Sequence, residues 1–305
     1  MKGELLMPTK NHVKINHTIT GASHVFGIIG QPVEFSLSPM IHNTISDFLG
    51  HHNAYVAFPV QSGGLGEGVK GGHALGIKGF NVTHPYKQDV IPMLTYVDPL
   101  ALKIGAVNTL QYEKDGYRGY NTDADGLYKS LIQNNVSLKN KDVVVLGAGG
   151  AARAVCMMAA HYGARSIYIL NRTVNNAELL AIEVRKHYNI DTRSLTLDQW
   201  ELVPEQAICF QTTSVGMGET KSLSPIEDHR FYKKISTAVD LIYNPAKTHF
   251  LKNAEKQGCY IMNGFGMLFF QAVKAYEIWN DMIFTDSQLE LLLTQIEGAY
   301  RQMND

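Results

Sequence analysis

The order of apolar and polar positions predicts an α/β region in the first part of the chain. Apolar runs bounded by turn residues predict strands at 25–29, 55–60, 76–83, 108–112 and 117–120. A helix is expected after the first strand, because Ser38 can cap a helix, Pro39 suits the first helical position, and apolar residues then recur at helical spacing. A glycine-rich stretch occupies residues 63–72. This region closes near residue 122.

The second part of the chain alternates strands and helices. A helix is expected from Asp125 to about Gln133, followed by an apolar run at Asp142–Leu146 that is typical of a buried parallel strand. Further strands are predicted at 166–171, 207–213, 236–243 and 259–263, and helices at 151–163, 175–188 and 248–257. Helical spacing resumes at Gly264, and a last helix opens at Ser287. This alternation is typical of a doubly wound parallel sheet.

Length and the order of elements predict an α/β protein with two domains. A chain of 305 residues, 45% of them hydrophobic, exceeds what one core usually fills. We expect an N-terminal α/β substrate domain at 1–122, completed by C-terminal helices within 265–305. A Rossmann-like nucleotide-binding domain is expected at 123–264, with the substrate cleft between the two domains. Residues 1–23 show no clear period and carry no prediction.

Charge and apolar content exclude several classes of partner. The net charge is −1 and no long run of like charges occurs, which argues against nucleic acid and anionic membranes as partners. No stretch approaches the roughly 18 apolar residues of a membrane span, and no basic segment followed by a hydrophobic one opens the chain. We therefore expect a cytoplasmic protein. A homodimer is compatible with the sequence, which does not determine the oligomeric state.

The cysteines and histidines do not predict a metal site. Cys156, Cys209 and Cys259 each lie inside an apolar run, where a free cysteine behaves as a small buried hydrophobe. No CxxC pair occurs, and the twelve histidines form neither HxxxH nor HExxH. We expect free thiols and no metal.

A glycine-rich turn predicts a dinucleotide site. The segment VVVLGAGGAAR begins in a buried strand and ends in an alanine-rich helix, and Gly147, Gly149 and Ala152 occupy the three fingerprint positions. The first glycine permits the tight turn, the second lets the backbone approach a pyrophosphate, and the small third residue lets the helix pack on the strand. The helix N-terminus then offers free N–H groups to the phosphates. This pattern predicts a nicotinamide-dependent oxidoreductase.

The end of the next strand favours NADP over NAD. An acidic residue at this place holds the ribose 2′-hydroxyl of NAD, whereas an arginine accommodates the 2′-phosphate of NADP. Here the strand ends in Asn171, Arg172 and Thr173, with no acid. A guanidinium matches a phosphate with two hydrogen bonds, so NADP is the expected cofactor. The alternative is that Arg172 is an ordinary solvated surface residue.

Two polar clusters outside the glycine turn indicate a catalytic site. One is Asn81–Lys87 (NVTHPYK), and the other is Gly119–Asp123 (GYNTD) at the expected hinge between the domains. If Lys87 and Asp123 end near one cleft, the aspartate keeps the lysine charged and positioned for acid–base work beside a hydride acceptor. An ordinary surface ion pair remains the alternative.

From Gly30 to Gln271 the chain resembles the shikimate dehydrogenases. The resemblance rests on collinear blocks in that family's order and spacing: GQPVEFSLSPMIHN, GFNVTHPYK, IGAVNTL, GYNTDADG, VLGAGGAAR, NRT, TTSVGM, DLIYNPAKT and NGFGMLFFQA. It implies reduction of 3-dehydroshikimate to shikimate with NADPH, a step toward chorismate and the aromatic amino acids. The substrate implied is a small molecule.

The resemblance also implies a role for individual residues. Lys87 and Asp123 resemble the catalytic pair, with Lys87 donating or relaying a proton and Asp123 orienting it. Ser36 and Ser38 resemble the hydroxyls that hold the substrate carboxylate. The remaining substrate contacts implied are Asn81, Thr83, Asn108, Tyr243 and Gln271. The cofactor contacts implied are Gly147, Ala148, Gly149, Gly150, Ala151, Asn171, Arg172, Thr173, Leu241 and Gly264.

Three positions depart from the family pattern. Phe35 stands where the family usually has histidine, and we expect it to alter affinity more than activity. Asn176 stands where NADP-preferring members commonly have a second basic residue, so discrimination against NAD should be weaker. His84 replaces an aliphatic residue and is expected in an exposed turn.

Two alternatives remain open. One is a quinate/shikimate dehydrogenase with relaxed use of NAD and NADP, which the loss of the second basic residue favours. The other is a sensor that binds nucleotide or shikimate without catalysis, against which the retention of both Lys87 and Asp123 argues.

Overall fold

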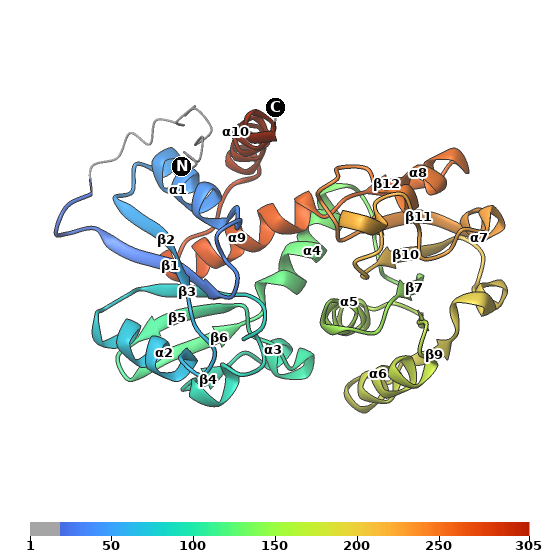
Figure 1. Ribbon diagram of the computed structural model, residues 1–305, viewed down its shortest axis with the longest axis horizontal. Coiled ribbons are helices and arrows are strands. Elements are labelled where there is room, and N and C mark those ends of the chain that lie inside the picture. Colours follow the sequence, from blue (N-terminus) through green and yellow to red (C-terminus); the bar gives the residue numbers. More distant parts are fainter. Residues whose placement is uncertain (1–18, 305) are drawn as a thin grey trace, which may run out of the picture.

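The computed structural model describes residues 19–304 and contains two α/β units joined by a pair of helices. Each unit is built on one six-stranded sheet, and the two sheets lie at opposite ends of the molecule (Figure 1). The predicted α/β class with a Rossmann-like second unit is confirmed. Residues 1–18, which carry no prediction, lie outside the described part.

The first sheet has the strand order β2-β1-β3-β5-β6-β4. Its strands are β1 (His24–Gly30), β2 (Asn53–Pro59), β3 (Gly79–Val82), β4 (Tyr96–Val97), β5 (Thr109–Glu113) and β6 (Gly116–Tyr120). Strand β1 runs parallel to both β2 and β3, whereas β5 runs antiparallel to β3 and β6. All five predicted strands are present in this sheet, and only the two-residue β4 is additional.

Two helices of the first unit have no sequence prediction. Helix α2 (Leu65–Ala74) occupies the glycine-rich stretch, and α3 (Pro99–Ile104) is a short helix capped by Asp98. Four of the ten residues of α2 are glycines, which lowers its intrinsic helix propensity. Leu65 and Val69 lie one turn apart and are both buried. Tertiary packing of this apolar face therefore stabilises a helix that propensity does not predict.

Helix α1 (Ser38–Leu49) forms as predicted, but the prediction that Ser38 caps it is wrong. Leu37 occupies the N-cap position, no side chain caps the helix, and Ser38 is its first residue. The reason is that the Ser38 side chain is buried and lines a cavity. Its hydroxyl therefore faces the cavity at the N-terminal end of the helix.

The second sheet is entirely parallel, with the order β12-β11-β10-β7-β8-β9. Its strands are β7 (Asp142–Leu146), β8 (Ser166–Leu170), β9 (Asp191–Leu195), β10 (Ala207–Gln211), β11 (Ile235–Asp240) and β12 (Tyr260–Met262). This is the Rossmann strand order, whose direction of winding reverses between β7 and β10. Strand β9 was not predicted, because it is an edge strand whose polar residues leave no apolar run in the sequence.

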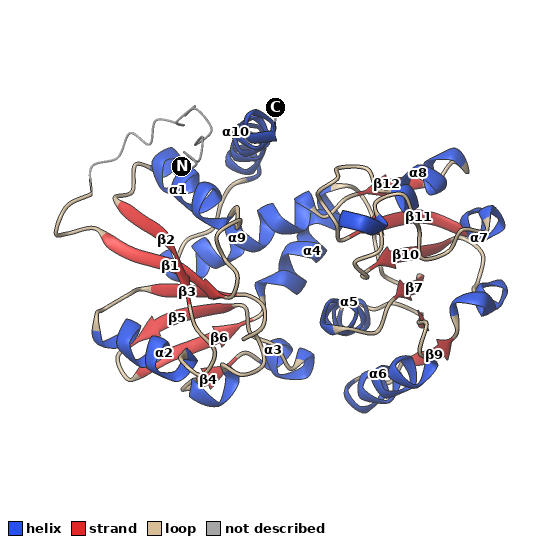
Figure 2. Ribbon diagram, in the orientation of Figure 1, coloured by secondary structure: helices blue, strands red, loops and turns tan. Residues whose placement is uncertain are grey.

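Helices cover both faces of the second sheet, as Figure 2 shows. They are α5 (Gly150–His161), α6 (Val174–His187), α7 (His229–Lys234) and α8 (His249–Lys256), of which only α7 was not predicted. Short 3₁₀ helices occur at Ile91–Met93, Leu197–Leu202 and Gly218–Thr220. The three cysteines are free and buried, as expected. Within residues 19–304, no helix is both long and apolar enough to cross a membrane.

Helices α4 (Thr122–Gln133) and α9 (Phe265–Asn280) lie side by side between the two sheets. Helix α4 begins three residues before its predicted start, because the Asn121 side chain accepts a hydrogen bond from Ala124 N and caps it. Gly126 marks the closest approach: a Cβ atom there would lie 2.4 Å from the backbone nitrogen of Gln271. The last helix, α10 (Asp286–Asn304), packs against α1.

The contact at Gly126 predicts the result of adding one methyl group. We expect Gly126→Ala to lower the free energy of unfolding by about 1–3 kcal/mol, because backbone atoms of α9 cannot move aside easily. Gly71→Ala in α2 is the matched control, since its Cβ would meet no atom within 4 Å. That variant should gain about 0.5–1 kcal/mol. Urea denaturation of both variants is the measurement, and equal gains would contradict the close packing.

Candidate active site

A cavity of about 360 Å³ lies where the first sheet, α1, α4 and α9 meet the loop after β11. It brings together every residue that the sequence assigned to substrate or catalysis. These are Ser36, Ser38, Asn81, Thr83, Lys87, Asn108, Asp123, Tyr243 and Gln271. They come from six separate segments, so only the tertiary fold collects them. Phe35 lines the same cavity with its side chain 92% exposed.

Lys87 and Asp123 form an ion pair in this cavity. Lys87 Nζ donates a hydrogen bond to Asp123 Oδ2 at 2.7 Å, and the side chains are 36% and 16% exposed. Lys87 follows β3, where its carbonyl oxygen accepts from Val107 N, and Asp123 lies in the first turn of α4. The positive end of α4 stabilises the carboxylate there. The pair therefore joins the turn after β3 to the first turn of α4 and lines the cavity.

Two buried asparagines supply fixed polar groups at the cavity wall. Both amide hydrogens of Asn81 are engaged, by the carbonyl of Asn108 and by Thr109 Oγ1, and its Oδ1 accepts from Tyr55 Oη. Asn108 Oδ1 accepts from Thr122 N at 2.7 Å, and its amide nitrogen donates to Thr122 Oγ1. One amide hydrogen of Asn108 and one lone pair of Asn81 remain for a ligand. The sequence did not indicate Tyr55, which holds Asn81 in place.

The serines lie where the cavity meets the N-terminus of α1. Ser36 Oγ accepts a hydrogen bond from Ser38 N at 3.2 Å. Because the first turn of a helix exposes N–H groups and the positive end of its dipole, this end of the cavity favours an anion. Two hydroxyls and a helix terminus suit a carboxylate.

The start of α9 comes very close to the loop that follows β11. A Cβ atom at Gly264 would lie 2.0 Å from the carbonyl oxygen of Leu241, so only glycine permits this crossing. Gly264 N donates to Ile242 O at 3.0 Å. The crossing brings Leu241 and Tyr243 of the second unit to the cavity in the first.

A second cavity, of about 390 Å³, adjoins the first on the side of the glycine turn. It is lined by Gly150 and Ala151 of α5 and by His84 and Gln88 of the first unit. His84 is exposed, as expected. Five residues line both cavities: Thr83, Lys87, Asp123, Leu241 and Met267. The ion pair therefore lies at the junction of two ligand-sized spaces.

The glycine turn has the geometry that a pyrophosphate requires. Gly147 has φ +114°, a conformation that favours glycine, and Gly149 forms the extended N-cap of α5. A Cβ atom at Gly149 or Gly150 would meet nothing within 4 Å, so the backbone there is open to a ligand. Ala152 is fully buried where the helix packs on the sheet. These residues fit a dinucleotide.

The end of β8 fits a 2′-phosphate. Asn171 Nδ2 donates to Thr173 O at 2.9 Å, and Thr173 precedes α6 without using its hydroxyl as a cap. Arg172 is exposed, and no residue of the described part forms a hydrogen bond or ion pair with its side chain. A free guanidinium beside a helix N-terminus favours a phosphate group. Asn176 is also exposed and adds no charge.

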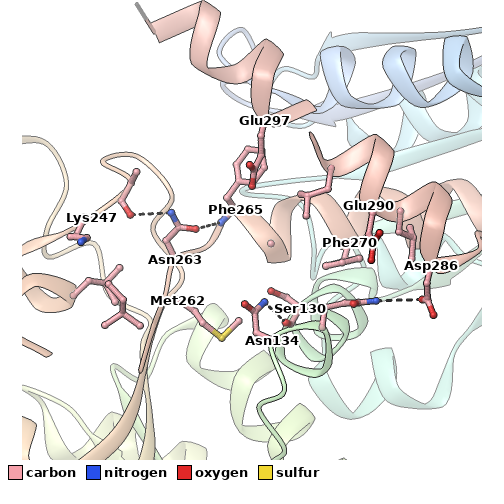
Figure 3. A pocket seen from close by; sticks show the side chains of 17 residues that line it. Ser130, Asn134, Lys247, Met262, Asn263, Phe265, Phe270, Asp286, Glu290 and Glu297 are labelled. Atoms are coloured by element: carbon pink, nitrogen blue, oxygen red, sulfur yellow. Dashed lines mark hydrogen bonds between the residues drawn. The ribbon is translucent and has the colours of Figure 1, made fainter. Parts of the chain in front are cut away.

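A cavity of about 590 Å³, larger than the two described above, lies elsewhere (Figure 3). It separates α10 from α8, β12 and the end of α4, and no predicted site residue lines it. Its polar groups bond one another: Asn263 bridges Ala246 O and Phe265 N, and Gln133 donates to Asp286. We therefore assign the chemistry to the two smaller cavities. No group of His, Cys, Asp or Glu in residues 19–304 could hold a metal ion.

Asp240, at the end of β11, is a fully buried carboxylate that the sequence did not indicate. Burial raises its pKa to about 6, against the opposing effect of hydrogen bonds from Thr248, Ile242 N and Gln211. It lines neither cavity. Its only sequence signal is an aspartate at the end of an otherwise apolar strand.

Fold and site together define a two-domain, dinucleotide-dependent dehydrogenase. The family model described as the shikimate dehydrogenase substrate binding domain matches residues 28–110, and the model described as shikimate / quinate 5-dehydrogenase matches residues 130–218. The NADP(+) shikimate dehydrogenase of Caldanaerobacter subterraneus is 42% identical over 87% of this chain and 95% of its own. The chain belongs to the shikimate dehydrogenase family.

Solved structures support the same assignment. Shikimate 5-dehydrogenase from Listeria monocytogenes, in complex with shikimate and NAD, superimposes with a TM-score of 0.84. It is 31% identical, covering 92% of this chain and 99% of its own. Shikimate 5-dehydrogenase from Thermus thermophilus, in complex with NADP(H) and shikimate, has a TM-score of 0.78 and 31% identity over 90% and 99% of the two chains.

The buried carboxylate makes stability depend on pH. Because the folded pKa of Asp240 is about 6 and the ordinary value is 3.8, its favourable contribution is full below pH 3.8 and is lost as the pH rises through 6. We expect Asp240→Asn to gain stability relative to the native chain between pH 4 and 7, by up to about 3 kcal/mol. Urea denaturation across this range is the measurement.

The control for this measurement is Asp228→Asn in the same domain. Hydrogen bonds from Arg230 lower the pKa of Asp228 to about 2, so the difference between that variant and the native chain should stay flat above pH 4. A flat difference for Asp240→Asn as well would contradict the raised pKa.

Proposed function

We propose that this protein is an NADP-dependent shikimate dehydrogenase, which converts 3-dehydroshikimate, NADPH and one proton to shikimate and NADP⁺, reversibly. The observation that carries the proposal is the Lys87–Asp123 pair, 2.7 Å apart at the junction of the two cavities. A ketone held at this junction has the proton donor on one side and the nicotinamide on the other. The names of the relatives at 31–42% identity support the same reaction.

The ion pair performs the proton half of the reaction. Bound NADPH supplies the hydride to the carbonyl carbon, and electron density moves to the carbonyl oxygen. Lys87 Nζ gives its proton to that oxygen, becomes neutral, and regains a proton from water, to which its partly exposed side chain has access. Asp123 orients Lys87 between turnovers through their hydrogen bond, and its second oxygen is available to a substrate hydroxyl.

The rest of the substrate cavity suits a hydroxylated ring acid. Ser36, Ser38 and the N-terminus of α1 hold the carboxylate. The ring hydroxyls bond the remaining polar side chains, namely Asn81, Thr83, Asn108, Gln271 and Tyr243. A site whose buried polar groups await partners rejects analogues that lack the hydroxyls, since those groups would stay unpaired.

The residues that would hold the cofactor lie along the carboxyl edge of the second sheet. The turn Gly147–Ala151 at the N-terminus of α5 would hold the pyrophosphate. Asn171, Arg172 and Thr173 would bind the adenosine ribose, and Arg172 would pair with the 2′-phosphate. Leu241 and Gly264 would contact the nicotinamide half.

A second candidate is a quinate/shikimate dehydrogenase that also uses NAD. Asn176 favours it, because this position adds no second charge beside Arg172 to distinguish the two cofactors. The Listeria relative was crystallised with NAD. A homodimer and a cytoplasmic location also stay predictions, which light scattering and cell fractionation would test.

The catalytic role of Lys87 predicts a selective loss of turnover. We expect Lys87→Ala to lower kcat by about 10²–10⁴-fold, which is what a positioned acid or base contributes, while the dissociation constant for shikimate changes little. Lys139→Ala, at an exposed position of the second domain, is the control and should match the native enzyme. Steady-state kinetics and calorimetric binding measure the two quantities. Turnover near the native rate in Lys87→Ala would refute the assignment.

The cofactor assignment predicts a matrix of activities. Rates with shikimate and quinate, each with NADP and NAD, should be highest for shikimate with NADP. We expect Arg172→Ala to lower kcat/KM for NADP by about 10–100-fold, because a charged hydrogen-bonded pair is lost. The kcat/KM for NAD should be almost unchanged. Asn176→Arg should raise the preference for NADP. A higher rate with quinate would select the second candidate, and an unchanged cofactor ratio in Arg172→Ala would exclude that residue from 2′-phosphate binding.

A further inference from the structure

Two fully buried polar side chains, Gln211 and Asp240, end the neighbouring strands β10 and β11. Neither lines the substrate cavity nor the adjoining cofactor cavity. A buried carboxylate costs free energy unless it is well hydrogen-bonded. The hydrogen bonds of these two side chains therefore indicate what they do in the structure. Proton transfer by Lys87 does not explain either residue.

Gln211 fixes the loop that follows β10. Its Oε1 accepts hydrogen bonds from Thr213 N at 2.6 Å and Thr213 Oγ1 at 2.8 Å, and its Nε2 donates to Val215 O at 2.9 Å. This loop adjoins the glycine turn, because a Cβ atom at Gly147 would lie 2.6 Å from Thr212 Oγ1. One amide therefore folds the loop beside the pyrophosphate site.

Asp240 fixes the loop that follows β11 at both of its ends. Oδ1 accepts from Ile242 N at 3.0 Å, and Oδ2 accepts from Thr248 Oγ1 at 2.5 Å. Thr248 in turn caps α8 by accepting from Leu251 N. The segment between these anchors carries Tyr243, and Leu241, which lies between Asp240 and the first anchor, lines both cavities.

The two side chains also contact each other, since Gln211 Nε2 lies 3.4 Å from Asp240 Oδ1. We infer that Gln211 and Asp240 are positioning residues that together hold Leu241 where the nicotinamide end of the cofactor must lie. They act through the two loops and touch neither substrate nor cofactor. The inference rests on the proposed use of NADP.

The test compares the whole cofactor with a fragment that lacks nicotinamide. We expect Asp240→Ala, which leaves Ile242 N and Thr248 Oγ1 without their acceptor, to weaken NADPH binding by about tenfold. Binding of adenosine 2′,5′-bisphosphate, which carries only the adenosine end, should stay within about twofold. Calorimetry measures both affinities without turnover. The kcat should also fall, since a displaced nicotinamide transfers hydride poorly.

Conservative variants separate positioning from a general loss of stability. Asp240→Asn keeps the acceptor for Ile242 N and Gln211 and reverses only the bond with Thr248, so it should restore NADPH affinity and kcat. Thr248→Val, similar in shape to threonine, removes one anchor and should weaken NADPH binding selectively, which keeps the test valid if Asp240→Ala does not fold. Asp228→Ala, which removes the cap of α7 in the same domain, should change stability alone.

The outcomes distinguish this inference from the proposed function. Folded Asp240→Ala and Thr248→Val variants that bind NADPH as the native protein does would overturn the inference. Equal weakening of NADPH and of the adenosine fragment would also overturn it, because the damage would then extend to the whole domain. A native protein that binds neither NADPH nor the fragment would refute the proposed function itself.

Discussion

The packing of α4 against α9 is the constraint on which the site depends. Both helices approach closely at small residues: a Cβ atom at Gly126 would meet the backbone of Gln271, and one at Gly266 would lie 2.2 Å from Ser130 Oγ. Helix α4 begins at the Lys87–Asp123 ion pair, and α9 begins where the chain crosses Leu241. The packing of these helices therefore helps to set the distance between Lys87 in the first unit and Leu241 in the second.

Electrostatic recognition in this protein relies on helix N-termini and few charged side chains. Helix α1 directs its N-terminus at the end of the substrate cavity that suits a carboxylate, and α5 directs its own at the open glycine turn. Arg172 adds one cation at the start of α6. The small number of cations agrees with the net charge of −1. Helix N-termini allow an anionic substrate and an anionic cofactor to bind without a basic surface.

Much of the site was predictable, because its residues lie in short motifs whose chemistry is local. The glycine turn, the NRT segment at the end of β8, and Lys87 with Asp123 are examples. The polar supports were not predictable. Tyr55 on β2 reaches Asn81 on β3 past the intervening β1, and Gln211 on β10 contacts Asp240 on the neighbouring β11, so each pair depends on strand order. A serine that faces a cavity and a serine that caps a helix have the same local sequence, which is why the prediction for Ser38 was wrong.

The sequence by itself determined the fold class, the parallel strands of the second domain and the candidate reacting groups, Lys87 and Asp123. Apolar runs and glycine turns are local properties of the sequence, so they can be recognised without knowledge of distant contacts. Tertiary structure alone decided that α2 forms in a glycine-rich stretch, that β9 adds to a sheet edge, and that six segments meet in one cavity. The physical reason is that burial and hydrogen bonding between distant segments outweigh local propensity, which amounts to at most about 1 kcal/mol for each ordinary residue.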